Sequence, residues 1–240
     1  MTAPSILLLH GAALGGWMWQ PSVRRLRESH EVFTPDLPGH LGSREPHFTT
    51  NAAAADLLAG SIGQGPVTVV GFSIGGQIAM ELAARHPSLV DRLVVVSSLT
   101  TPGLSPAFMA GLMRVTRPLA HSRRFARAQA RASLIPESQF ENYWRSSTSL
   151  SADSLAAIGR ENFDYRTPST WGSTSLPTLL IAGSEEPRQL LAGMRALHSS
   201  RVGSELEIVD GAGHGVPLER PDWFGDRLAR FIAGTAANMQ

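Results

Sequence analysis

Residues 67–86 read VTVVGFSIGGQIAMELAARH: an apolar run, a glycine-rich turn around Ser73, and an amphipathic segment that Pro87 ends. A short uninterrupted apolar run followed by such a segment is typical of a parallel strand buried on both faces that leads into a helix. Glycines two places before and two places after the serine allow a tight turn, with the Ser73 hydroxyl at its tip and the Ile74 N–H beside it. The start of a helix also favours negative charge on a substrate oxygen. The stretch therefore predicts a nucleophilic serine. An ordinary strand-to-helix turn is the alternative, because the pattern also arises by chance in a chain with 23 glycines.

The alternation of strand and helix continues on both sides of this stretch. Short apolar runs are separated by amphipathic segments, an arrangement typical of an α/β fold with a mostly parallel central sheet flanked by helices. The predicted strands are Ser5–Leu9, Glu31–Thr34, Val67–Val70, Arg92–Ser97, Thr178–Ala182 and Glu205–Val209. The predicted helices include Met18–Ser29, Ala52–Ile62, Gly75–His86 and Asp222–Ala233.

One long stretch, residues 102–171, interrupts this alternation. It contains no strand-like run, and its apolar residues recur at helical spacing. A structureless loop of this length inside a compact domain is improbable, so the stretch predicts a helical cap inserted into a core formed by residues 1–101 and 172–240. Most of its large apolar residues should pack the cap onto the core, with a few left to line a pocket. These residues are Phe108, Met109, Leu112, Met113, Phe125, Phe140 and Trp144.

A serine hydroxyl needs a general base, and His214 is the best placed of the eight histidines. It lies in a glycine-rich turn after the last predicted strand, at the edge where a parallel sheet delivers its functional residues. The acid that orients it should follow the strand Thr178–Ala182, where Glu185 and Glu186 both stand. Asp210 is better explained as a turn residue. His10, His40 and His47 are expected in loops at the same edge as neighbours of the site, and His30, His86, His121 and His198 at the surface.

The overall composition excludes several classes of chemistry. The 240 residues include 21 basic and 20 acidic ones, a formal net charge of +1 that argues against a general binder of nucleic acid or membrane surfaces. Every basic residue is arginine and there is no cysteine, so lysine Schiff bases, Walker-type lysines, cysteine nucleophiles, thiolate metal sites and disulfides are ruled out. No apolar run approaches the roughly 20 residues of a membrane span, and the first residues lack the pattern of an export signal. We therefore expect a cytoplasmic location.

Six arginines without an intervening acidic residue form a basic stretch within the predicted cap. A solvated outer face is the simpler interpretation of such a stretch. The alternative is a basic rim at the mouth of the pocket that attracts an anionic substrate such as a CoA thioester. The six are Arg114, Arg117, Arg123, Arg124, Arg127 and Arg131.

Five segments together resemble the α/β-hydrolase fold superfamily, and the resemblance covers nearly the whole chain outside the predicted cap. The early oxyanion-loop segment is most similar to the compact esterase and hydroxynitrile-lyase branch. The segments are LLLHGAALGGWMW (7–19), PDLPGHLGS (35–43), GFSIGG (71–76), PTLLIAGSEEP (177–187) and GAGHGVPLERP (211–221).

The resemblance implies a triad of Ser73, His214 and Glu186, with the N–H groups of Ala12 and Ile74 forming the oxyanion hole. Glu186 occupies the place where the family usually has aspartate, and Glu185 remains the alternative. The lyase branch relies on a threonine where this chain has Gly11, and on a lysine that is absent here, which disfavours cyanohydrin cleavage. Haloalkane and epoxide chemistry would need a carboxylate in place of Ser73.

The sequence thus predicts a serine hydrolase that cleaves carboxylic esters of small to medium apolar substrates through an acyl-enzyme, as a monomer or homodimer. A thioesterase, a lactonase or a carbon–carbon bond hydrolase would use the same triad, and a non-catalytic ligand-binding protein is the alternative of a different class. No cofactor, metal, nucleic acid or membrane is expected to take part. The predicted substrate contacts are Gly11, Phe72, Met109, Met113, Trp144 and Val216.

Overall fold

The computed structural model describes residues 5–63, 66–103 and 105–234, and within them six strands form one all-parallel sheet. The strand order is β2-β1-β3-β4-β5-β6, which confirms the predicted parallel α/β fold. The outer ends of the predicted core domain, at residues 1–4 and 235–240, lie outside the described residues. The strands are β1 (Ile6–Leu9), β2 (Val32–Phe33), β3 (Val67–Phe72), β4 (Val90–Val96), β5 (Thr178–Gly183) and β6 (Glu205–Val209).

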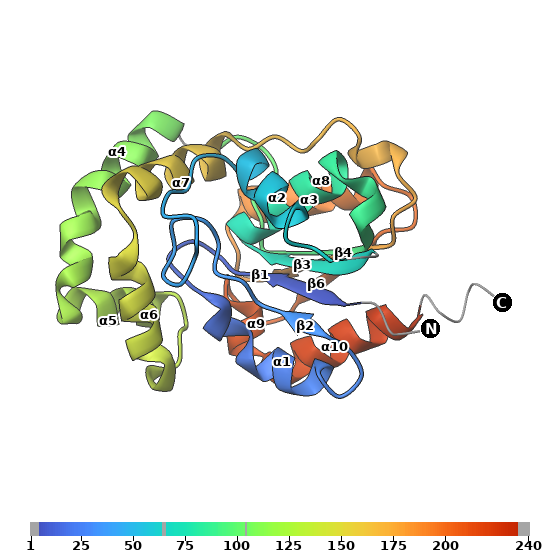
Figure 1. The fold of residues 1–240 in the computed structure, drawn as a ribbon, viewed down its shortest axis with the longest axis horizontal. Helices are drawn as coiled ribbons and strands as arrows, with labels where there is room; N and C mark the ends of the chain where they lie inside the picture. The colour runs from blue at the N-terminus through green and yellow to red at the C-terminus, as the bar shows by residue number, and fades with distance from the viewer. Residues whose placement is uncertain (1–4, 64–65, 104, 235–240) are drawn as a thin grey trace.

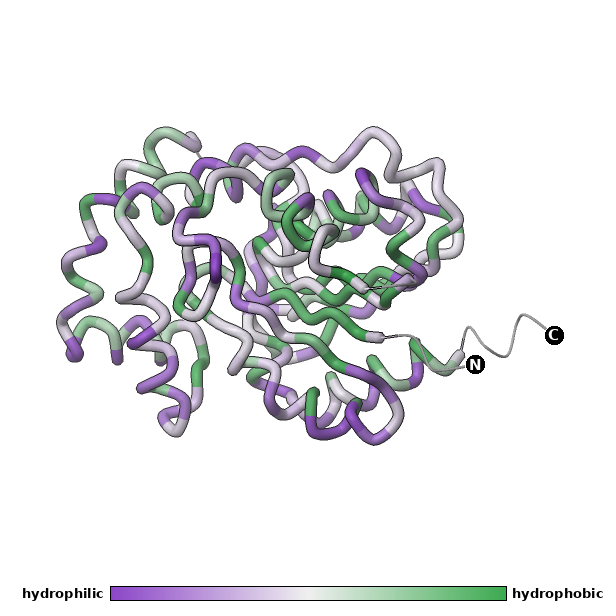
Figure 2. Tube along the Cα trace, viewed as in Figure 1, coloured by the Kyte–Doolittle hydropathy of each residue, from purple (hydrophilic) through white to green (hydrophobic). Residues whose placement is uncertain are grey.

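Strand β3 occupies the middle of the sheet and is buried along its whole length. Successive side chains of a strand point to opposite faces, so Val69 packs into the apolar core on one side and Val70 into the core on the other. Burial of each such side chain contributes about 1.5–3 kcal/mol to folding. The resulting apolar strands run through the centre of the molecule in Figure 2.

Helices cover both faces of the sheet. On one side lie α2 (Asn51–Ala59), α3 (Ile74–Arg85) and α8 (Arg188–Ser199), and on the other lie α1 (Gln20–Leu26) and α10 (Pro221–Gly234) (Figure 1). The expected helix at 18–29 begins instead with a 3-10 turn, η1 (Gly16–Trp19), and α1 ends at Leu26. Two further short elements are η2 (Pro87–Leu89), directly after α3, and α9 (Val216–Glu219), before α10.

Among the described residues between β4 and β5, four α-helices stand beside the sheet, within the stretch where the sequence predicts a cap (Figure 1). Their starts are marked locally: Ser105 and Ser151 cap two of them by accepting N–H bonds from Phe108 and Ser154. The helices are α4 (Pro106–Thr116), α5 (Arg123–Ala132), α6 (Phe140–Ser149) and α7 (Ala152–Asp164), joined by η3 (Arg117–His121) and η4 (Glu137–Gln139) and followed by η5 (Trp171–Ser173).

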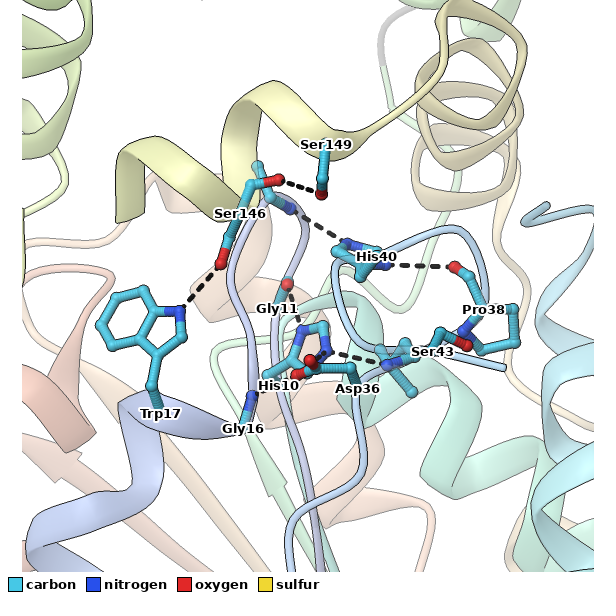
Figure 3. Close-up of polar contacts among 12 residues, drawn as sticks. His10, Gly11, Gly16, Trp17, Asp36, Pro38, His40, Ser43, Ser146 and Ser149 are labelled. Carbon is cyan, nitrogen blue, oxygen red and sulfur yellow. Dashed lines mark hydrogen bonds and ion pairs between the residues drawn. The ribbon is translucent and has the colours of Figure 1, made fainter. Parts of the chain in front are cut away.

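Polar contacts fasten this group of helices to the sheet domain. Gln77, which is fully buried in α3, donates from Nε2 to Asn162 Oδ1 of α7 at 3.0 Å. The indole N–H of Trp17 donates to Ser146 Oγ of α6 at 3.0 Å (Figure 3). The four helices are therefore held in one position over the carboxyl ends of the strands. Across the described part of the chain, no helix combines the length and apolar composition that a bilayer crossing requires.

Candidate active site

Ser73 lies at the turn between β3 and α3 in a strained backbone conformation. Its φ is 56° and its ψ is −120°, a region that costs about 1–3 kcal/mol for a residue with a side chain. Close backbone contacts impose the turn: a Cβ at Gly71 would lie 2.2 Å from Gly75 O, and a Cβ at Gly75 would lie 2.4 Å from Leu9 O. Both predicted glycine positions therefore allow β3, α3 and the loop after β1 to meet at the serine.

His214 reaches Ser73 from the loop after β6. Its Nε2 lies 3.3 Å from Ser73 Oγ, and its ring centre lies 5.1 Å from that of Phe72. The two backbone N–H groups that flank it, those of Gly213 and Gly215, donate to the carboxylate of Glu219 at 3.0 and 2.9 Å. One side chain, that of Glu219, thus fixes this loop, a role that the sequence pattern does not indicate.

Glu186 follows β5 and contacts the opposite side of the same imidazole. Its Oε1 and Oε2 lie 3.1 and 3.0 Å from His214 Nδ1, and its side chain is fully buried. A carboxylate accepts hydrogen bonds, so the Nδ1 atom carries the proton and Nε2 is left free to accept from Ser73. Glu185 and Asp210, the two alternatives, are exposed. The structure therefore brings Ser73, His214 and Glu186 into one row.

Two N–H groups beside Ser73 are free to bind an oxygen. Within the described residues, neither the Ala12 nor the Ile74 N–H donates to an acceptor of the protein. Ile74 is buried and Ala12 partly so. Because buried backbone N–H groups are almost always paired, two that are left unpaired next to Ser73 are candidate donors to a bound oxygen atom.

Two buried histidines hold the loop that carries Ala12 (Figure 3). His10 donates from Nδ1 to Gly11 O at 2.8 Å and accepts the Leu37 N–H at Nε2 at 2.9 Å. His40 accepts the Ala13 N–H at Nε2 at 3.2 Å and donates from Nδ1 to Pro38 O. Each ring therefore needs Nε2 unprotonated in order to accept a hydrogen bond, so each imidazole must be neutral.

Burial keeps both rings neutral. It lowers the pKa of His10 to about 4 and that of His40 to about 3, and in His40 the neighbouring His10 lowers the pKa further. The two ring centres are 4.7 Å apart. The sequence predicts that both histidines lie near the site, but it assigns them no role. Their pairing with residues almost 30 positions away could not be read from the local sequence.

The candidate site opens into a cavity of about 500 Å³ between the sheet edge and the cap helices. Of the predicted substrate contacts, Phe72, Met109 and Met113 line it, and Ala12, Ser73 and His214 do so as well. Further apolar walls come from both parts of the chain. They include Leu14, Leu112, Phe125, Ile135, Tyr143, Leu155 and Leu218.

Three other predicted substrate contacts do not line this cavity. Val216 is fully buried, and Gly11 packs so closely on the ring of Phe72 that a Cβ there would lie 2.8 Å from it. Trp144 packs against the guanidinium of Arg123, which lies 4.4 Å from the centre of its ring. Arg117 does line the cavity, a position that its place in the basic stretch of the sequence does not indicate.

The basic stretch is partly neutralised by acids from elsewhere in the cap. Arg114 pairs with Asp153 at 3.0 Å and Arg127 with Glu137 at 3.1 Å. A third pair joins Arg123 to Glu141. These contacts are exposed, which fits the interpretation of a solvated outer face for the paired arginines.

The fold and these residues together are those of a hydrolase. The family model described as "Alpha/beta hydrolase family" matches residues 6–227, and the chain belongs to that family.

Among curated relatives, the pimeloyl-[acyl-carrier protein] methyl ester esterase of Xanthomonas campestris is 27% identical over 252 residues, spanning 96% of this chain and 95% of that protein. Two solved structures share the fold. The enol-lactonase from Burkholderia xenovorans LB400 has a TM-score of 0.82 at 21% identity, over 97% of this chain and 92% of the other. A thermophilic esterase from Thermogutta terrifontis has a TM-score of 0.80 at 21% identity, over 97% and 90%. The protein is an enzyme of the α/β-hydrolase kind with esterase-type relatives.

Proposed function

We propose that this protein is a serine hydrolase that cleaves carboxylic esters through an acyl-enzyme. The observation that carries the proposal is the continuous row from the buried Glu186 carboxylate through His214 to Ser73 Oγ, which opens into the cavity. A buried carboxylate, an imidazole and a hydroxyl in this order are the parts that nucleophilic acyl transfer needs.

In the proposed reaction, Ser73 Oγ attacks the ester carbonyl carbon while His214 Nε2 takes the hydroxyl proton. The carbonyl oxygen becomes an oxyanion, and the N–H groups of Ala12 and Ile74 stabilise it. The intermediate collapses when the C–O bond to the alcohol breaks, and His214 gives the proton to the departing oxygen. Water then attacks the acyl-enzyme with the same base, which releases the acid and restores Ser73. Glu186 stabilises the imidazolium in both halves of the reaction without exchanging the proton.

The cavity supports a small or medium substrate with an apolar part. Its volume of about 500 Å³ falls in the range of sites for small molecules, and most of its walls are apolar. The full-length relative from Xanthomonas is named for the hydrolysis of a methyl ester, which supports an ester among the substrates that such a triad can cleave. Thioesters and lactones are tested in parallel as competing substrates.

Substitution of Ser73 tests the proposal directly. A panel of short p-nitrophenyl esters should be hydrolysed by the wild-type enzyme, and Ser73→Ala should lower kcat by about 10³-fold or more because it removes the nucleophile. A fluorophosphonate should label the wild type and not the variant. Circular dichroism checks that the variant is folded.

Retained esterase activity in folded, purified Ser73→Ala would overturn the mechanism. A wild-type protein that binds esters yet shows neither burst nor turnover, and no labelling, would support the non-catalytic alternative instead.

A further inference from the structure

Arg117 stands out among the residues that line the active-site cavity. It lies at the start of η3, directly after α4, and is partly buried. Its Nε donates to the carbonyl oxygen of the buried Leu150 at 2.7 Å, which fixes the plane of the guanidinium. The described part of the chain supplies no hydrogen bond or ion pair to its two Nη groups.

The charge of Arg117 is not balanced inside the cavity. No aspartate or glutamate is among the described residues that line it, and Arg117 is the one permanently charged side chain there. The neighbouring arginines of the cap differ, because Arg114, Arg123 and Arg127 each pair with a carboxylate outside the cavity. A cation that no protein group pairs attracts an anion more strongly in a cavity with mostly apolar walls than it would in open solvent.

We propose that Arg117 binds a carboxylate on the substrate, so that the preferred ester carries an apolar chain with an anionic group. The inference rests on the proposed function, because it assigns a second recognition element to the same cavity. A guanidinium whose two Nη groups are free presents two parallel N–H donors, the arrangement that a carboxylate accepts in bidentate form. The apolar walls contributed by Met109, Met113 and Phe125 would contact the chain between the ester and this group.

A purely structural role for Arg117 makes a different prediction. The bond to Leu150 O uses only Nε, and loss of that bond would disturb the cap for every substrate alike. Binding of a carboxylate, in contrast, changes the reaction of anionic esters alone. The ratio of activities on two esters that differ only in this group separates the two roles.

The experiment compares mono-p-nitrophenyl adipate with p-nitrophenyl hexanoate, which have the same chain length and leaving group. Wild-type enzyme should show the higher kcat/KM on the adipate ester. Arg117→Gln should lower the adipate-to-hexanoate ratio by about 10- to 100-fold, the value of a charge-assisted hydrogen-bond pair. Arg124→Gln is the matched control, because it removes the same charge from an exposed residue of α5 that does not line the cavity, and its ratio should stay within about twofold of the wild type.

Binding to the Ser73→Ala protein gives a second readout that does not depend on turnover. Calorimetry should give a lower Kd for adipate than for hexanoate. Adding Arg117→Gln to this variant should abolish the difference between the two Kd values. Equal loss on both esters, or an unchanged ratio in Arg117→Gln, would overturn the proposal while leaving the esterase mechanism intact. Absence of turnover on every ester would instead refute the proposed function. Hexanoyl-CoA is tested as a third substrate, in which phosphates supply the negative charge. If Arg117→Gln lowers kcat/KM for hexanoyl-CoA more than for the adipate ester, the assignment to a carboxylate is overturned.

Discussion

Glu186 and Glu185 are adjacent in the sequence but have opposite surroundings. Glu186 is buried against His214, and Glu185 is exposed. Glu186→Gln should lower kcat by about 10⁴-fold, because an amide neither balances the imidazolium nor enforces the tautomer that accepts the serine proton. Steady-state kinetics on p-nitrophenyl butyrate measures the loss, and Glu185→Gln is the matched control with activity close to that of the wild type. Full activity in Glu186→Gln together with inactivity in Glu185→Gln would transfer the role to the neighbour.

At the scale of single residues, the sequence indicates the site where chemistry demands a particular residue type at a particular place. The strand-turn-helix context around Ser73 and the glycine-rich turn around His214 are such cases. Arg117 and Trp144 show what the sequence does not indicate. Both belong to the insertion, but only Arg117 lines the cavity. Which face of each cap helix meets the sheet edge depends on tertiary packing, and helical spacing alone does not contain that information.

At the scale of elements, the short helix α9 positions the loop that carries His214, because the carboxylate of Glu219 accepts the N–H groups on both sides of His214. Glu219→Gln should lower kcat by about 10- to 100-fold with little change in KM, because a loop displaced by even 1 Å misplaces the base. Fluorophosphonate labelling should slow in parallel with kcat, and the folded signal should persist. Glu185→Gln again serves as the control at the same edge of the sheet. A rise in KM with kcat unchanged would show that Glu219 contributes to substrate binding instead.

Two helical glycines allow a matched test of the turn between β3 and α3. A Cβ at Gly75 of α3 would lie 2.4 Å from Leu9 O and 2.5 Å from His10 O, whereas a Cβ at Gly111 of α4 would meet nothing within 4 Å. Gly75→Ala should therefore lower the free energy of unfolding by about 3 kcal/mol or more, since the backbone must move apart. Gly111→Ala should raise it by about 0.5–1 kcal/mol through helix propensity. Urea denaturation measures both, and a neutral Gly75→Ala would refute the close packing of β1 on α3.

At the scale of the whole molecule, the sequence predicts the sheet better than the relations between distant loops. Strands such as Val67–Phe72 are recognisable because burial on both faces leaves an uninterrupted apolar run. The start of α1 is less predictable, because a residue distant in the sequence fixes the 3-10 turn at Gly16–Trp19. Asp36 accepts the Gly16 N–H at 2.7 Å (Figure 3). Contacts of this kind appear only when the sheet has brought the loops after β1 and β2 together.

The two buried histidines, which join the loops after β1 and β2, should make the free energy of unfolding depend on pH. In the folded protein the pKa of His10 is about 4 and that of His40 about 3, while the ordinary pKa of a histidine is 6.5. Between pH 6.5 and pH 4 the unfolded chain therefore binds protons that the folded protein does not, and folding loses stability as the pH falls. Each histidine should contribute a slope of about 1.4 kcal/mol per pH unit.

Urea denaturation at several pH values between 7 and 4.5 measures this slope. Asp56 does not affect the slope in this pH range. Its hydrogen bond with Arg85 lowers its pKa to about 2, so its stabilising effect is lost only as the pH falls below the ordinary aspartate pKa of 3.8. Replacement of His40 by Gln, which keeps a donor and an acceptor without a titratable ring, should reduce the slope by about 1.4 kcal/mol per pH unit and leave the part due to His10. An unfolding free energy that stays constant from pH 6.5 to 4.5 in the wild type would contradict the neutral, buried state of both rings. It would also remove the physical reason for the fixed position of the Ala12 N–H, because a protonated His40 cannot accept the N–H of Ala13.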